Sequence, residues 1–200
     1  MATSPQPRIS PEEYVALEQK LGGKYEYHEG RMFAMSGVSL PHGRIQMNLA
    51  RRVEEALSES PCSAYPSDVR VVIEAADIAT YPDLSIVCGP EQHAKAYRHS
   101  ITNPTVLFEV FSASTERNDR GDKFGRYRRL VSLREYVLIS EYEVAVDLFR
   151  ADSGRWVLDP LRGEDAVLSL ISAGVEIPLR DIYRGVRFED AEEWQHYRSV

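Results

Sequence analysis

The sequence contains little cysteine, no long apolar run and no excess of positive charge. Cys62 and Cys88 are its only cysteines, which is too few for a disulfide framework, and they lack the spacing of metal ligands. We therefore expect two reduced thiols, with Cys88 packed in a strand, rather than a disulfide bridge. No stretch approaches the roughly 18 consecutive apolar residues that would cross a membrane.

The charge and the first residues narrow the possible classes further. The formal net charge is −7. This argues against tight non-specific binding of nucleic acid by the whole surface, so any such contact would have to be local. The N-terminus lacks the charged-then-apolar pattern of a secretory signal, and we expect a cytoplasmic protein without a membrane partner.

What is present is the composition of an ordinary globular chain. Of its 200 residues, 43% are hydrophobic and 28% are charged. No internal repeat, low-complexity tract or linker divides the chain. We expect residues 1–9 to form a flexible arm and residues 10–200 to form one domain.

Two helices have clear signals. Ser10, Pro11 and Glu13 make a capping box with proline at the first helical position, and Gly22 follows the apolar face. A second helix is expected over residues 42–58, with His42 in its first turn. Its apolar face consists of Ile45, Leu49, Val53 and Leu57.

Most of the remaining elements are expected to be strands. A hairpin is predicted over residues 24–35, with Glu26 on the face opposite Tyr25 and Tyr27, and a helix is predicted over residues 115–133. Further strands are predicted over residues 68–74, 83–88, 105–111, 135–140, 144–150 and 156–158, with edge strands at 166–170 and 175–177. One helix between strands, followed by consecutive strands, indicates an α+β fold with a mixed central sheet and flanking helices.

Glu109 lies in a strand that is apolar on both faces. Leu107 and Phe111 share its face, and the opposite face is apolar too, so the strand should be buried on both sides. A carboxylate there is costly unless it is paired, hydrogen-bonded or bound to a cation. For an isolated glutamate, a structural ion pair is the simpler interpretation.

Asp83, at the start of another apolar strand, changes that balance. By itself it is explained by turn chemistry, because Pro-Asp often begins or ends strands. If two carboxylates converge, however, one pKa rises strongly unless a cation neutralises them. Asp83 and Glu109 are therefore candidate ligands of Mg²⁺ or Mn²⁺, an ion that could polarise a phosphodiester.

Lys123 lies in a locally basic stretch. Residues 116–134 contain seven basic and three acidic residues, a net charge of +4. Lys123 should share a helix face with Arg120 and Tyr127, and it could stabilise charge that develops on a phosphate. The run fits a solvated face with internal ion pairs as well as it fits a phosphate contact. The residues that could cap this helix are Ser112, Ser114 and Thr115.

No single short motif in this sequence is specific for a protein family. The order and spacing of several short segments, taken together, are specific. These segments are residues 81–83, 106–115, 119–127 and 134–138, preceded by 25–31 and 41–45. Over about residues 10–185 this arrangement resembles the Uma2 family of restriction-endonuclease-like proteins, within the PD-(D/E)XK nuclease superfamily. The resemblance implies a mixed core sheet with helices on both sides and a divalent-metal nuclease site at Asp83 and Glu109.

The lysine departs from the superfamily pattern. In that pattern it stands two residues after the second acid, and here that position is Phe111. The resemblance suggests that Lys123, from the following helix, takes its place. It also makes Glu26 a candidate metal-binding or water-orienting acid, and His42 a candidate base or hydrogen-bond donor to phosphate. Without the resemblance, these two would be a surface carboxylate and a helix-terminal histidine.

The main hypothesis is a Mg²⁺- or Mn²⁺-dependent DNA endonuclease. Asp83 and Glu109 would bind the metal, Lys123 would assist the attacking water, and Glu26 and His42 would support the site. The alternative is a catalytically inactive nucleic-acid- or protein-binding module on the same fold, and a purely structural oligomer-forming domain is a third possibility. We expect a homodimer, because a duplex cut needs two active sites and the strand edges in residues 135–177 need cover.

Overall fold

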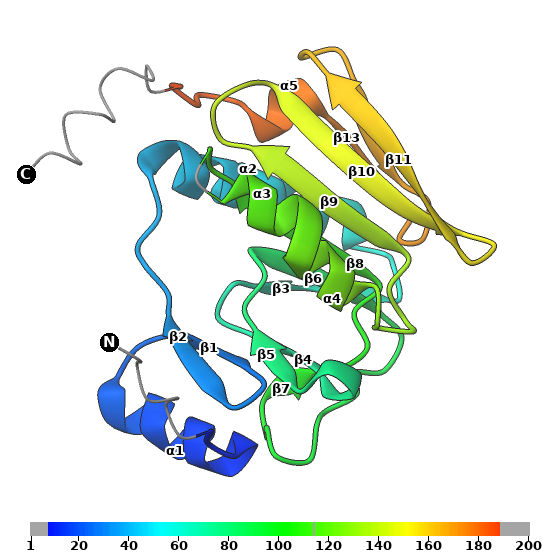
Figure 1. Cartoon of the computed structure of the whole chain (residues 1–200). Coiled ribbons are helices and arrows are strands. Elements are labelled where there is room, and N and C mark those ends of the chain that lie inside the picture. The colour runs from blue at the N-terminus through cyan, green and yellow to red at the C-terminus, as the bar shows by residue number, and fades with distance from the viewer. Residues whose placement is uncertain (1–7, 114, 189–200) are drawn as a thin grey trace, which may run out of the picture.

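The computed structural model describes residues 8–113 and 115–188, which form three sheets with helices around them (Figure 1). The helices are α1 (Pro11–Leu21), α2 (Leu40–Leu57), α3 (Glu116–Asn118), α4 (Phe124–Tyr127) and α5 (Leu179–Ile182), with a 3-10 turn η1 (Glu74–Ala76) and a π-helical turn η2 (Asp119–Lys123). The strands are β1 (Tyr25–His28), β2 (Arg31–Ala34), β3 (Cys62–Pro66), β4 (Arg70–Ile73), β5 (Ile78–Thr80), β6 (Leu84–Cys88), β7 (Ser100–Ile101), β8 (Val106–Phe111), β9 (Glu135–Ser140), β10 (Ala145–Asp152), β11 (Arg155–Arg162), β12 (Val167–Leu170) and β13 (Val175–Pro178). No described helix is long and apolar enough to span a membrane.

The central sheet has six strands in the order β11-β10-β9-β8-β6-β3. Strand β8 pairs parallel with β9 and antiparallel with β6, so the sheet is mixed. A second sheet has the order β2-β1-β5-β4-β7, and β12 pairs with β13 in a separate hairpin. The predicted fold class is therefore confirmed, although the chain builds two large sheets where one was expected.

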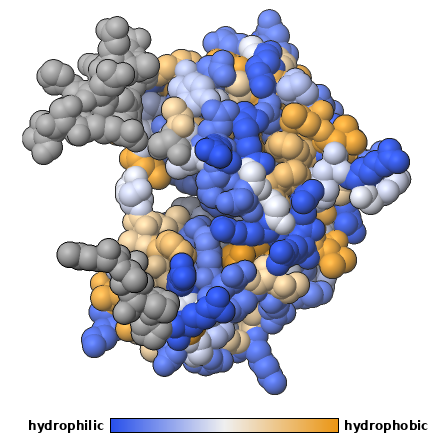
Figure 2. All heavy atoms as spheres, in the orientation of Figure 1, coloured by the Kyte–Doolittle hydropathy of each residue, from blue (hydrophilic) through white to orange (hydrophobic). Residues whose placement is uncertain are grey.

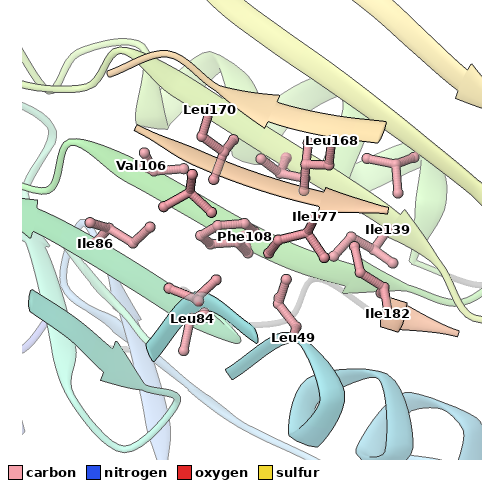
Figure 3. Close-up of a cluster of buried hydrophobic side chains, with 14 of the residues drawn as sticks. Leu49, Leu84, Ile86, Val106, Phe108, Ile139, Leu168, Leu170, Ile177 and Ile182 are labelled. Atoms are coloured by element: carbon pink, nitrogen blue, oxygen red, sulfur yellow. The ribbon is translucent and has the colours of Figure 1, made fainter. Parts of the chain in front are cut away.

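Strand β8 is buried on both faces, as its sequence predicts. On one face Val106 and Phe108 pack against α2 and the β12–β13 hairpin (Figure 3). On the other face Leu107 and Phe111 join a cluster that includes Tyr127 of α4 and residues of β4 and β5. Glu109 shares this second face, so its carboxyl group lies where α4 and the five-stranded sheet meet the central sheet.

The N-terminal caps of both long helices follow from local hydrogen bonds, and the one at Ser10 was predicted. The Ser10 amide donates to Glu13 Oε2 (2.7 Å) and the Glu13 amide donates to Ser10 Oγ (3.2 Å), which completes the capping box of α1. Helix α2 begins at Leu40, two residues before the expected start, because Ser39 Oγ accepts from the His42 amide at 3.1 Å.

The helix predicted over residues 115–133 was too long. The helical segment comprises α3, η2 and α4 and ends at Tyr127. Beyond it the chain turns back toward the central sheet, where Leu130 and Leu133 are buried and Ser132 Oγ donates to the Pro104 carbonyl at 2.8 Å. The apolar residues that suggested more helix instead anchor the connection to β9. Ser114, one of the expected caps, lies outside the described residues, as do residues 1–7 of the expected arm.

The prediction of two reduced thiols was wrong. Cys62 and Cys88 form a disulfide across a sequence separation of 26 residues. The reason is strand β3, which the sequence did not reveal. It pairs antiparallel with β6 in a register that sets Cys62 directly opposite Cys88.

Candidate functional site

Asp83 and Glu109 converge at the junction of the two large sheets. Asp83 immediately precedes β6, and its amide donates to the Phe108 carbonyl of β8 at 3.1 Å. Its carboxylate then turns toward β8, where Oδ2 accepts from the Val110 amide at 2.6 Å. Strand pairing thus holds the Asp83 carboxylate beside the residue that follows Glu109.

The carboxyl group of Glu109 is buried, and only one of its two oxygens accepts hydrogen bonds from the residues that the structure describes. The residue is 4% exposed, and its Oε1 accepts from both Tyr127 Oη (2.6 Å) and Lys123 Nζ (2.8 Å). Across the described chain, no residue donates a hydrogen bond to Oε2. Burial raises the pKa of Glu109 to about 8: the attraction of Lys123 opposes this rise, while repulsion from Asp83 and Asp119 adds to it.

Lys123 sits among three carboxylates. Its Nζ is 2.8 Å from Glu109, 3.8 Å from Asp119 and 4.0 Å from Glu26. No ion pair between Lys123 and Asp83 occurs in the described part of the chain. Although burial acts to lower it, these acids raise the pKa of Lys123, so the ammonium remains charged. The helix therefore does turn Lys123 back onto Glu109, but not onto both metal-ligand candidates.

Arg120 does not share the face of Lys123 and Tyr127, contrary to the expectation from helical spacing. It forms ion pairs with Asp147 of β10 and with Glu116, and its guanidinium lies 5.0 Å from the ring centroid of Phe111. The π-helical turn accounts for the difference, because its wider winding changes which positions align.

Glu26 reaches the site from the five-stranded sheet. Its Oε1 accepts a hydrogen bond from Thr80 of β5, and its Oε2 lies 3.2 Å from Nε2 of His28. Although burial acts to raise it, contacts with His28, Lys123 and Thr80 lower the pKa of Glu26 to about 2. Glu26 is therefore a carboxylate near neutral pH, and its Oε1 lies 4.0 Å from Lys123 Nζ.

His42 approaches Asp83 from α2. Its Nε2 lies 3.1 Å from Asp83 Oδ1, and Gln46, one helical turn later, donates to the same oxygen at 2.6 Å. On the other side of the ring, Nδ1 lies 3.7 Å from Glu141. Although burial acts to lower it, the hydrogen bonds to Asp83 and Glu141 raise the pKa of His42 to about 9. Of the two roles the sequence left open, this geometry favours a hydrogen-bond donor over a base.

Three polar residues of the site were missed from the sequence. Asp119 precedes Lys123 by four residues and could have been found from helical spacing. Glu141 follows β9, and because the parallel strands β8 and β9 end at the same edge, it falls beside the end of β8. Thr80 gave no signal, since its role depends on the pairing of β5 with β1.

Asp83 and Glu109 could bind a hard divalent cation if water and a substrate phosphate supplied its other ligands. Within the described residues, no group of three or more His, Cys, Asp and Glu side chains could hold a metal ion by itself. Mg²⁺, however, is usually held by one or two carboxylates and takes its other ligands from water and substrate phosphate. Asp83 and Glu109 supply two carboxyl groups, and Glu109 Oε2 is the oxygen left without a donor.

Comparisons with known proteins show what the chain is similar to. The model of the Uma2 family, described as "Putative restriction endonuclease", matches residues 11–180. Two proteins of Synechocystis, both described as uncharacterized, are similar to the chain. One is 35% identical over 187 residues, which cover 93% of this chain and 97% of the relative. The other is 29% identical over 159 residues, which cover 79% and 90%.

A solved structure from Anabaena variabilis, described as "a putative nuclease belonging to DUF820", shares the fold. It superposes with a TM-score of 0.66, and the match covers 88% of this chain and 97% of that chain. At 17% sequence identity, the likeness shows a common restriction-endonuclease-like architecture.

Proposed function

This chain belongs to the Uma2 family of restriction-endonuclease-like proteins, and we propose that it is a divalent-metal-dependent endonuclease that hydrolyses phosphodiester bonds in DNA. The observation that carries the proposal is the state of Glu109. Its carboxyl group is buried beside Asp83, has one unpaired oxygen and has a raised pKa. Its Oε2 receives no hydrogen bond from the described residues and is an acceptor that a cation could use.

Each residue then has a distinct role. Asp83 and Glu109 would hold Mg²⁺ or Mn²⁺, which when bound polarises the phosphodiester and neutralises its charge. Lys123, still protonated beside Glu109, would stabilise negative charge that develops on the phosphate or orient the attacking water. His42 and Gln46 hold the Asp83 carboxylate in place. Glu26 would orient water beside Lys123.

Cleavage of supercoiled plasmid tests this assignment. With Mg²⁺ or Mn²⁺ the wild type should nick the plasmid, and chelation should stop it. Asp83→Ala, Glu109→Gln and Lys123→Met should each lower the rate about 100-fold or more. Asp165→Ala, which changes a carboxylate that is 96% exposed and distant in sequence, is the matched control and should leave the rate unchanged. Equal nicking by wild type and Asp83→Ala would remove the proposed site.

One observation favours a second candidate, a non-catalytic binding module on the same fold. The position that carries lysine in the superfamily pattern is Phe111, which is buried in a hydrophobic cluster. Calorimetric titration separates the two candidates, because an inactive module would show no heat of binding at millimolar Mg²⁺ or Mn²⁺.

We also propose that the protein acts as a homodimer, since two active sites are needed to cut both strands of a duplex. Strand β11 is an edge of the central sheet and carries exposed Val157 and Leu158, which a second copy could cover. Light scattering that shows a strict monomer would overturn this proposal.

A further inference from the structure

A groove of about 940 Å³ opens at the opposite end of β8 from the end that leads to Asp83 and Glu141. Its lining includes Thr105, which lies four residues before Glu109 and therefore about 13 Å from it along an extended strand. Leu107 stands between these two positions and packs in one buried cluster with Tyr127 and Leu130. The groove is therefore separate from the candidate active site.

The groove carries positive charge and free donors. Arg129 and Arg134 line it, and Glu74 is the one acid among its lining residues. Arg129 is exposed, and its guanidinium meets no partner in residues 8–113 and 115–188. Arg134 is anchored at the rim, where its NH1 donates to the Val131 carbonyl at 3.0 Å. No aromatic side chain lines the groove, so it offers nothing on which a base could stack. Its chemistry suits a phosphate group.

A run of arginines connects the groove with the candidate site. Residues 126–134 contain four arginines and no acid, in a chain whose net charge is −7. At one end, Arg126 NH1 lies 3.2 Å from Nδ1 of His28, the residue that contacts Glu26. The guanidinium of Arg128 follows, over the Phe124 ring, and Arg129 and Arg134 reach the groove. Hydrophilic side chains cover the middle of the face that carries α3 and α4 (Figure 2).

From this arrangement we propose that the groove binds the sugar-phosphate backbone of the same nucleic-acid strand that is cleaved at Glu109. The inference rests on the proposed nuclease function for the identity of the ligand. The groove lies about 13 Å along β8 from Glu109, so the contact would fall within a few nucleotides of the scissile phosphate. Contacts of this kind position the substrate and do not read its sequence.

Binding of a fluorescently labelled DNA duplex, measured by anisotropy without divalent metal, tests the proposal. All variants carry Glu109→Gln, so that no cleavage can occur. Arg129→Ala/Arg134→Ala should weaken binding on the order of ten- to a hundredfold. The slope of log affinity against log salt concentration should fall by about 2, since each lost phosphate contact removes about 0.9. Arg155→Ala/Arg187→Ala is the matched control: both side chains are exposed, and the net charge changes equally.

The outcomes separate this inference from the nuclease proposal. Weaker binding and a smaller salt slope for the groove variant, with the control unchanged, support the inference even if the wild type does not cleave DNA. An unchanged affinity and slope overturn it, even if the wild type cleaves. A wild type that binds no duplex also overturns it. If the double variant folds poorly, Arg129→Glu can replace it. This single substitution reverses one exposed charge without removing a hydrogen bond, and it should give the same loss of binding.

Discussion

Two buried glutamates lie in the adjacent parallel strands β8 and β9, yet their surroundings differ. Glu135, at the start of β9, is 2% exposed, and both of its oxygens are occupied. Oε1 accepts from Arg150 (3.3 Å) and from the Ile171 amide (3.1 Å), and Oε2 accepts from the amide (3.2 Å) and the hydroxyl of Ser172. Glu109 is nearly as buried, but only Oε1 has donors, and Asp83 and Asp119 stand nearby.

Under the proposed function, Glu135 is a structural carboxylate and Glu109 is a ligand of the metal. Glu135 ties the turn after β12 to the central sheet, and each donor it meets would otherwise be left without a partner. Glu109 contacts Lys123 and Tyr127 through one oxygen and is repelled by Asp83 and Asp119. Under the proposed function, a divalent cation would bind its other oxygen.

The largest expected contrast is in stability. Glu135→Gln should lower the free energy of unfolding by about 3 kcal/mol, because the new amide group faces donors and leaves them unsatisfied. Glu109→Gln should change it by less than about 1 kcal/mol, since a single amide oxygen can accept from both Tyr127 and Lys123. Urea denaturation at pH 7 measures both. Equal losses would show that Glu109 is as structural as Glu135.

A smaller contrast concerns the cations that face the two glutamates. Lys123→Met should lower the melting temperature. Millimolar Mn²⁺ should then raise the melting temperature of this variant by more than that of the wild type, because the ion replaces the lost positive charge beside Glu109, Asp119 and Glu26. Arg150→Met should also lower it, but without rescue by Mn²⁺, since its partner Glu135 keeps three other donors. The same Mn²⁺-dependent shift in both variants would contradict the comparison.

A third contrast is in the pH dependence of stability. The pKa of Glu109 rises from 4.5 to about 8 on folding, so the folded state holds a proton that the unfolded state loses in this range. The free energy of unfolding should therefore fall as pH rises from about 5 to 8, by at most about 1.4 kcal/mol per pH unit. His42, raised from 6.5 to about 9, should add a fall of the same sign between those values.

Glu109→Gln should flatten the slope below pH 6.5 and leave the His42 contribution intact. Glu135→Gln should keep both contributions and lower the whole curve. Urea denaturation at a series of pH values gives these slopes. A Glu109→Gln slope as steep as that of the wild type between pH 5 and 6.5 would show that the proton is held elsewhere, as for example on Asp119, whose pKa burial also raises.

The sequence was most informative where local chemistry decides the structure. The capping box at Ser10, the apolar period of α2 and the two-faced apolar strand β8 depend on neighbours within a few residues, and each was predicted. The placement of Asp83 at the start of one apolar strand and of Glu109 within another followed from the same patterns, and the family resemblance made them candidate metal ligands.

The features that could not be predicted from the sequence depend on pairing between residues far apart in the chain. Strand β3 and its disulfide to β6 require a partner 26 residues away. The π-helical turn that separates Arg120 from Lys123 reflects packing against β10, which no local propensity encodes. Glu141 and Thr80 reach the site only because their strands pair in a particular register. Asp119 is the exception, since the spacing to Lys123 was present in the sequence and was overlooked.

The central claim is that Glu109 is kept for a divalent cation, and calorimetric titration with Mn²⁺ tests it most directly. Wild type and Glu135→Gln should bind Mn²⁺ with similar affinity, provided that the variant is folded. Glu109→Gln should lose at least about tenfold in affinity, because a neutral amide replaces an ionisable ligand. Equal binding by wild type and Glu109→Gln, or no binding by the wild type, would contradict the claim.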